Sequence, residues 1–130
     1  GMVAGAEGTK TYPFDGAFDD AAFGVESAIV DRGLVIDSVS HVGAMLERTR
    51  AETGGETIFK AADVFQFCSA TLSRKVMEVD PLNISHCPYG VFVTEDAAGQ
   101  VSIGYRMMPE GAMKEVEALL DAIAREAADE

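Results

Sequence analysis

The chain has 130 residues, of which 48% are hydrophobic and none is Trp, which is the size and composition of one globular domain. Ten Lys and Arg against 22 Asp and Glu leave a formal net charge of -12, which disfavours nucleic acid and anionic membrane surfaces as partners. No apolar run approaches the roughly 20 residues that span a bilayer. We therefore expect a soluble protein with no membrane partner.

The N-terminus bears on processing and location. Gly1 directly before Met2 is typical of the residue left after tag cleavage, which predicts Met2 as the native start. Residues 3–10 contain neither a basic start nor an apolar signal segment, which favours the cytoplasm, or the periplasm if a signal peptide has been removed. Residues 1–10, rich in Gly and Ala, are expected to be flexible, and residues 11–130 to form a single domain.

The first half of the chain predicts alternating strands and helices. Residues 11–14 and 34–39 are apolar enough for strands. Between them, residues 18–29 repeat apolar side chains at helical spacing. A short helix follows the second strand and ends near Gly54, with His41 at the junction between strand and helix.

The middle of the chain carries a strand followed by a capped helix. Residues 63–67 predict a third strand, after which the Ser69 hydroxyl is suited to cap the N-terminus of a helix. Pro81 is expected to stop that helix, because proline has no backbone N–H and clashes with the preceding turn.

The C-terminal third predicts a hairpin and an amphipathic helix. Residues 89–95 and 101–107 alternate at strand period around a turn in which Gly99 takes a positive φ. Residues 113–127 then carry an apolar stripe with charged residues away from it, including Glu117 and Asp121, which we expect to be solvated. The fold class predicted is α+β, in two layers: an antiparallel-rich sheet with helices packed on it, the last being this amphipathic helix.

Three segments resemble a known family when taken together: VGAMLERT at residues 42–49, FCSATLS at 67–73 and HCPYGVFVT at 86–94. Over residues 11–108 they resemble the family called domain of unknown function 302, in a subgroup with Phe-Cys-Ser before a helix and Cys-Pro-Tyr before the hairpin. The resemblance implies a compact α+β fold and a tendency to form homodimers. It implies no reaction.

The two cysteines are the first candidate site. Cys68 lies between a strand end and a helix N-terminus, where free amides and the helix dipole are expected to lower its pKa. Cys87 follows 19 positions later, and two sheet strands could bring the sulfurs together. Both cysteines as buried apolar residues, a structural or regulatory disulfide, and thiol catalysis all remain open. The spacing is not Cys-x-x-Cys, so a thioredoxin-like mechanism has no motif behind it.

The two histidines can be considered as metal ligands and as general bases. His41 and His86 together with the cysteines supply zinc-ligand types, but their spacing matches no standard pattern. We therefore expect no metal. His86 is a candidate general base for Cys68 without an identifiable orienting acid, and His41 is favoured as a polar residue at a helix start.

The predicted hairpin carries three further candidates. Tyr89, Tyr105 and Arg106 could line a pocket or bind an anion, although cross-strand packing is the more ordinary interpretation. No phosphate loop, nucleophile elbow or HExxH motif occurs, and no cofactor is expected.

The leading hypothesis is a homodimeric domain that binds a small ligand or a protein partner without turnover. Its pocket would lie near Cys68, Ser69, Cys87 and Tyr89. The first alternative is a thiol-based redox or sulfur-handling protein that uses Cys68 and Cys87. The second is a structural subunit that acts by association.

Overall fold

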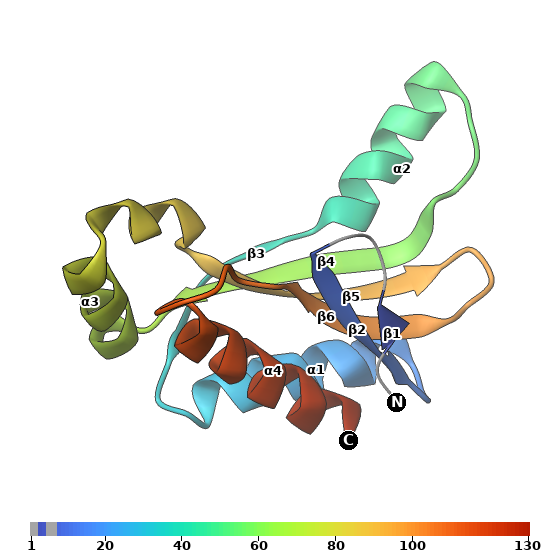
Figure 1. Cartoon of the computed structure of the whole chain (residues 1–130). Coiled ribbons are helices and arrows are strands. Elements are labelled where there is room, and N and C mark those ends of the chain that lie inside the picture. Colours follow the sequence, from blue (N-terminus) through green and yellow to red (C-terminus); the bar gives the residue numbers. More distant parts are fainter. Residues whose placement is uncertain (1–2, 5–7) are drawn as a thin grey trace.

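A six-stranded sheet forms the centre of the computed structural model, which describes residues 3–4 and 8–130 (Figure 1). Every pair of neighbouring strands is antiparallel, in the order β1-β2-β6-β5-β4-β3. The strands are β1 Val3–Ala4, β2 Thr9–Phe14, β3 Val35–Ser40, β4 Phe59–Cys68, β5 Tyr89–Asp96 and β6 Val101–Arg106. The helices are α1 Phe18–Val30, α2 Val42–Thr53, α3 Ala70–Val79, the 3-10 helix η1 Pro81–His86, and α4 Lys114–Ala128.

Helices α1 and α4 lie side by side on one face of the sheet and enclose the core (Figure 1). Alternate residues of β5 and β6, such as Val91, Val93 and Ile103, are fully buried there, because side chains along a strand point to opposite faces. Leu120 and Ile123 of α4 complete the core from the helix side. The predicted two-layer α+β fold, with the C-terminal amphipathic helix on the sheet, is therefore confirmed.

The other face of the sheet is not covered by α1 or α4, and we call it the open face. Its residues on the central strands, such as Val64, Gln66 and Phe92, are half-buried. The Phe92 ring lies directly over Gly104 on the neighbouring strand, where an added Cβ would come within 2.6 Å of the ring. Gly104 therefore makes room for an aromatic side chain on the open face.

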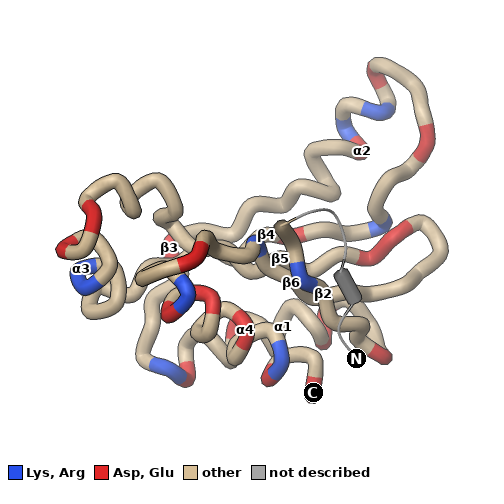
Figure 2. Tube along the Cα trace, in the orientation of Figure 1, with Lys and Arg blue, Asp and Glu red and all other residues tan. Residues whose placement is uncertain are grey.

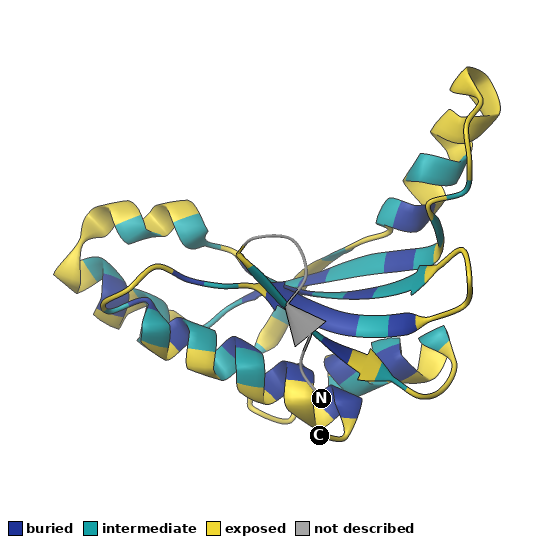
Figure 3. Cartoon of the chain, turned by 45° about the vertical axis from the view of Figure 1, so that its right-hand side comes forward, coloured by how far each residue is buried: buried dark blue, intermediate teal, exposed yellow. Residues whose placement is uncertain are grey.

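Helix α2 projects away from the sheet (Figure 3), and Gly43 is its only buried residue. Within the described chain, β4 is the element with which α2 makes substantial contact. That contact is close: a Cβ on Gly43 would lie 2.6 Å from the backbone nitrogen of Ala62. Glycine thus allows the first turn of α2 to approach β4, while the rest of the helix extends into solvent.

Most predicted elements are confirmed, with shifts at their boundaries. Strand β2 begins at Thr9 and pairs with β1, so part of the segment expected to be flexible is a strand; residues 1–2 and 5–7 lie outside the described residues. Strand β4 begins at Phe59, four residues before the predicted start, because its polar and alanine-rich first half carries little strand signal. The 3-10 helix after Pro81 was not predicted.

Two predicted turn and cap details are confirmed. Gly99 in the hairpin has φ of 90°, and the Ser69 hydroxyl accepts a hydrogen bond from the Leu72 N–H at 3.3 Å. Among the described residues, no helix is both long and apolar enough to span a bilayer.

Replacing Gly43 with Ala tests the close approach of α2 to β4. Alanine favours a helix over glycine by about 1 kcal/mol, but the added Cβ meets backbone atoms that cannot move without displacing a strand. We expect Gly43→Ala to lower the free energy of unfolding by roughly 1–3 kcal/mol in urea denaturation. Ala44→Ser, which adds one atom at the next and exposed position, is the control. An unchanged or higher stability for Gly43→Ala would contradict this packing.

Candidate functional site

The two cysteines meet where β4 ends and β5 begins. Cys68 is the last residue of β4, and Cys87 lies two residues before Tyr89, the first residue of β5. Because Phe67 pairs with Tyr89 in the antiparallel ladder, both sulfurs come to the same end of the sheet. They are 2.9 Å apart as free, half-buried thiols. The spacing left open whether the cysteines approach each other, and in the structure they do.

The pKa of Cys68 is raised to about 12, so the expected depression of its pKa is wrong. Burial is the largest cause, followed by the hydrogen bond to Cys87; the backbone of Tyr89 has a smaller opposing effect. The physical reason is position: Ser69, not Cys68, caps the N-terminus of α3, and the Cys68 sulfur interacts with a second thiol instead of with the helix amides.

Tyr89 extends this cluster into the core beneath α3. Its ring is 1% exposed and stands edge-on to Phe67, with ring centroids 6.1 Å apart. Its hydroxyl is 2.8 Å from the Ser73 hydroxyl on α3. Burial raises the pKa of Tyr89, and the nearby thiols raise it further. Tyr89 therefore acts as a buried tether between the sheet and α3.

A hollow of about 250 Å³ opens next to the thiols on the open face. Neither cysteine lines it, but His86 and Pro88, the two neighbours of Cys87, both do. The full lining is Val64, Ser85, His86, Pro88, Tyr89, Gly90, Phe92, Arg106 and Met108. The lining combines apolar side chains, such as those of Val64 and Phe92, with the polar groups of Ser85, His86 and Arg106.

The chain was compared with known families and structures. The family model described as "Domain of unknown function DUF302" matches residues 9–130. The chain belongs to this family. Among solved structures, the crystal structure of uncharacterized conserved protein DUF302 from Bacillus stearothermophilus matches with a TM-score of 0.65 and 17% identity, over 95% of each chain. At that identity the likeness supports the fold alone. No curated protein matches.

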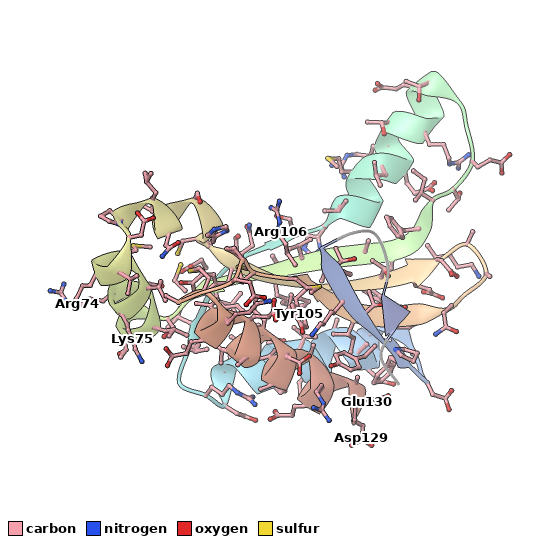
Figure 4. The ribbon with its side chains drawn as sticks, viewed as in Figure 1. Arg74, Lys75, Tyr105, Arg106, Asp129 and Glu130 are labelled. Carbon is pink, nitrogen blue, oxygen red and sulfur yellow. The ribbon has the colours of Figure 1, made fainter. Side chains whose placement is uncertain are left out.

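Tyr105 and Arg106 are adjacent in this DUF302 chain but serve opposite faces of the sheet (Figure 4). Tyr105 is fully buried on the helix side, so it does not line the hollow. Arg106 is exposed on the open face. Its guanidinium makes no ion pair or hydrogen bond with any residue of the described chain. Of the two candidates, only Arg106 is available to a ligand.

His41 lies apart from the thiols. Its Nδ1 is 2.8 Å from Asp63 Oδ1, and Asp63 precedes Cys68 by five residues on β4, or roughly 16 Å along a strand. His41 lines other hollows, beside α2. The His86 imidazole makes no hydrogen bond with any described residue. Among the described residues, no group of three or more His, Cys, Asp or Glu is arranged to hold a metal ion.

Two acidic residues of α4 correct the expectation that the carboxylates of this helix are solvated. Asp121 Oδ1 accepts hydrogen bonds from Tyr12 at 2.5 Å and from Tyr105 at 2.7 Å. Glu117 accepts one from the Met108 N–H at 2.7 Å. Burial alone would raise the pKa of Glu117, but Met108 and Lys114 outweigh it and lower the pKa.

These contacts were missed because they join residues as many as 109 positions apart. The available signal was weak: a tyrosine in each of the neighbouring strands β2 and β6, and carboxylates bordering the apolar stripe of α4. The cluster ties α4 to β2 and β6, and its hydroxyls are satisfied internally. We therefore assign it to the stability of the fold and not to the site.

A larger hollow of about 720 Å³ lies at the opposite end of the molecule, beside the chain terminus. It is lined by Pro13, Phe14, Asp15, Gln100, Ala128, Asp129 and Glu130. Its charged groups are all carboxylates, and it contains none of the predicted site residues. The smaller hollow beside the thiols therefore remains the candidate site, despite its size.

All three tyrosines should ionise late in the folded protein. The pKa of Tyr12 is raised to about 12, and those of Tyr89 and Tyr105 are also raised, in each case chiefly by burial. In the unfolded chain a phenol loses its proton near pH 10, so the folded state holds more protons above that pH. The free energy of unfolding should therefore be intact below pH 10 and fall as the pH rises towards 12.

Phenolate absorbance at 295 nm measures this effect directly. The denatured chain should titrate near pH 10 and the folded protein only at higher pH. Tyr12→Phe should reduce the loss of stability between pH 10 and 12 in parallel urea denaturations. A phenol that titrates near pH 10 in the folded protein would contradict the arrangement.

Proposed function

We propose that this domain binds a small organic anion with an apolar body, without turning it over, in the hollow lined by Phe92, His86 and Arg106. The observation that carries the proposal is the position of Arg106. Arg106 lines the hollow together with apolar residues, and its guanidinium has no partner among the described residues. The chain has a net charge of -12, yet none of its described carboxylates pairs with Arg106, which leaves this cation available for a ligand.

The pairing of the other arginines supports this interpretation. Four of them pair with carboxylates of their own chain: Arg32 with Glu126, Arg50 with Glu47, Arg74 with Glu78 and Arg125 with Asp121. Arg48 and Arg106 pair with no carboxylate of the described residues, and Arg48 lies on the projecting helix α2 (Figure 2). Of these two arginines, Arg106 is the one that lines the hollow beside η1.

The chemistry of the lining suits a carboxylate on a flat or branched apolar group. A guanidinium binds a carboxylate through two parallel hydrogen bonds. His86 and Ser85 supply further donors at the rim. The apolar part of the ligand would contact the lining residues Val64, Phe92 and Met108. A lining that combines apolar side chains with a few polar groups is typical of small-molecule sites.

Two observations weigh against thiol catalysis, the alternative function. A nucleophilic cysteine needs a populated thiolate, whereas the pKa of Cys68 is raised to about 12. In addition, His86 has no hydrogen bond to any described residue that would orient it as a base. A binding role is therefore favoured over turnover.

Benzoate tests the proposed site, with benzyl alcohol as its neutral counterpart. In an NMR titration of ¹⁵N-labelled protein we expect benzoate to shift the amide signals of Gly90, Phe92 and Arg106. Arg106→Gln should weaken benzoate binding about tenfold, the loss expected for one charged hydrogen-bonded pair, and should leave benzyl alcohol unaffected.

Arg74→Gln is the matched control, because that guanidinium is exposed on α3 and pairs with Glu78. It should bind benzoate as the parent does. Benzoate that leaves these three amides unshifted, or that binds equally well after Arg106→Gln, would show the assignment to be wrong.

We also propose that the domain acts as a homodimer held through α2. A helix of 12 residues is marginally stable by itself and usually depends on packing, yet only Gly43 of α2 is buried. Met45 on α2 and Ile58 just beyond it are 44% and 58% exposed. A second copy of the chain would cover these side chains, consistent with the resemblance noted from the sequence.

Sedimentation equilibrium over a concentration series tests the dimer. The parent should have twice the chain mass of 13.8 kDa, and Met45→Glu should shift the mass towards one chain. Phe23→Glu, at an exposed position on α1, is the control and should remain dimeric. A parent of 13.8 kDa at high micromolar concentration would exclude the dimer, and a monomeric Phe23→Glu would place the interface on α1.

A further inference from the structure

We propose that Cys68 and Cys87 form a reversible dithiol–disulfide site that reacts with a low-molecular-weight disulfide and, when oxidised, ties the α3–η1 segment to the sheet. This role differs from ligand binding and from thiol catalysis. The cysteines are themselves the modified groups, and the consequence is a change in how one segment is attached.

The geometry needs little adjustment to form the bond. The sulfurs are 2.9 Å apart, less than about 1 Å beyond the disulfide bond length of about 2.05 Å. Cys68 ends β4 and Cys87 lies two residues before β5, the strand paired with β4, so the backbone already brings the two sulfurs to one place. Both thiols are half-buried, which leaves each partly accessible to a small reagent.

The segment between the cysteines is lightly attached to the rest of the fold. It comprises α3 and η1, which project from the end of the sheet (Figure 1). Val76 is the only buried residue of α3, and η1 has none. Polar contacts to the body of the domain are few: Ser73 with Tyr89, and Lys75 with Glu115. A bond between Cys68 and Cys87 would join the two ends of this segment to each other, next to the sheet.

The order of the chemical steps follows from the environment of each sulfur. Cys87 is assigned the first attack because its neighbours His86 and Pro88 line the open hollow. Cys68, by contrast, ends β4, an interior strand of the sheet. Burial also raises the pKa of Cys68, which agrees with this order. Cys87 loses its proton to solvent, attacks one sulfur of the small disulfide and releases the other half as a thiol. Cys68 then loses its proton and attacks the Cys87 sulfur, which releases the second thiol. One small disulfide is reduced to two thiols, and the protein loses two hydrogens.

Oxidised glutathione is the probe, with intact-mass measurement after acid quenching. The parent should lose two hydrogens and retain no glutathione, and dithiothreitol should reverse the change. Cys68→Ser should retain one glutathione on Cys87, because no second thiol is present to displace it. Cys87→Ser should react much more slowly, since only Cys68 remains.

Trypsin provides a second readout that does not depend on either variant. Between the cysteines it can cut only after Arg74 and Lys75. After oxidation, cutting there should be several-fold slower, and the two cut pieces should stay joined on a non-reducing gel and separate on a reducing one. Linked peptides that contain Cys68 and Cys87 would identify the bond.

The proposal is wrong if the parent keeps two free thiols in excess oxidised glutathione, or retains glutathione as stably as Cys68→Ser does. It is also wrong if the disulfide forms but leaves the rate of tryptic cutting unchanged, since the attachment of α3 and η1 would then not depend on it. These outcomes are independent of benzoate binding and of the mass of the oligomer.

Discussion

The pairing of β4 with β5 is the constraint on which the rest of the structure depends. Its register places Phe67 opposite Tyr89 and so brings together the two cysteines that flank this pair. The same two strands supply buried residues such as Phe65 and Val91 to the core, and Val64 and Phe92 to the open face. A shift of one residue would exchange the two faces, and the core, the hollow and the thiol pair would all be lost.

The two faces of the sheet have different physical roles. The face beneath α1 and α4 is closed by apolar packing, and its hydroxyl groups are satisfied within the protein, as Tyr12 and Tyr105 are by Asp121. On the open face, Arg106 lines a partly apolar hollow and has no ion-pair partner among the described residues. Buried polar groups must find partners within the protein, whereas an exposed group such as Arg106 can remain in contact with solvent. The proposed binding site is therefore on the open face alone.

The pKa of Cys68 differs from the value that its position in the sequence predicts, because a second thiol lies beside it. A cysteine beside a helix N-terminus is expected to be acidic, but Ser69 occupies the capping position and the Cys68 sulfur contacts Cys87. Burial without a nearby cation then raises the pKa of Cys68. Such a thiol is better suited to slow, reversible pairing with its neighbour than to rapid nucleophilic attack.

The sequence by itself determined most of the elements, because strand alternation, the Ser69 cap, the turn at Gly99 and the apolar stripe of α4 depend on residues close together in the chain. Only the tertiary structure decided which functional groups meet. Three features depend on strand order and register, which join residues distant in sequence: the Tyr12–Asp121 bond, the 2.9 Å approach of Cys68 to Cys87 and the position of Arg106 beside the hollow. Periodicity carries no information about such contacts, so the sequence could name candidate residues without placing them together.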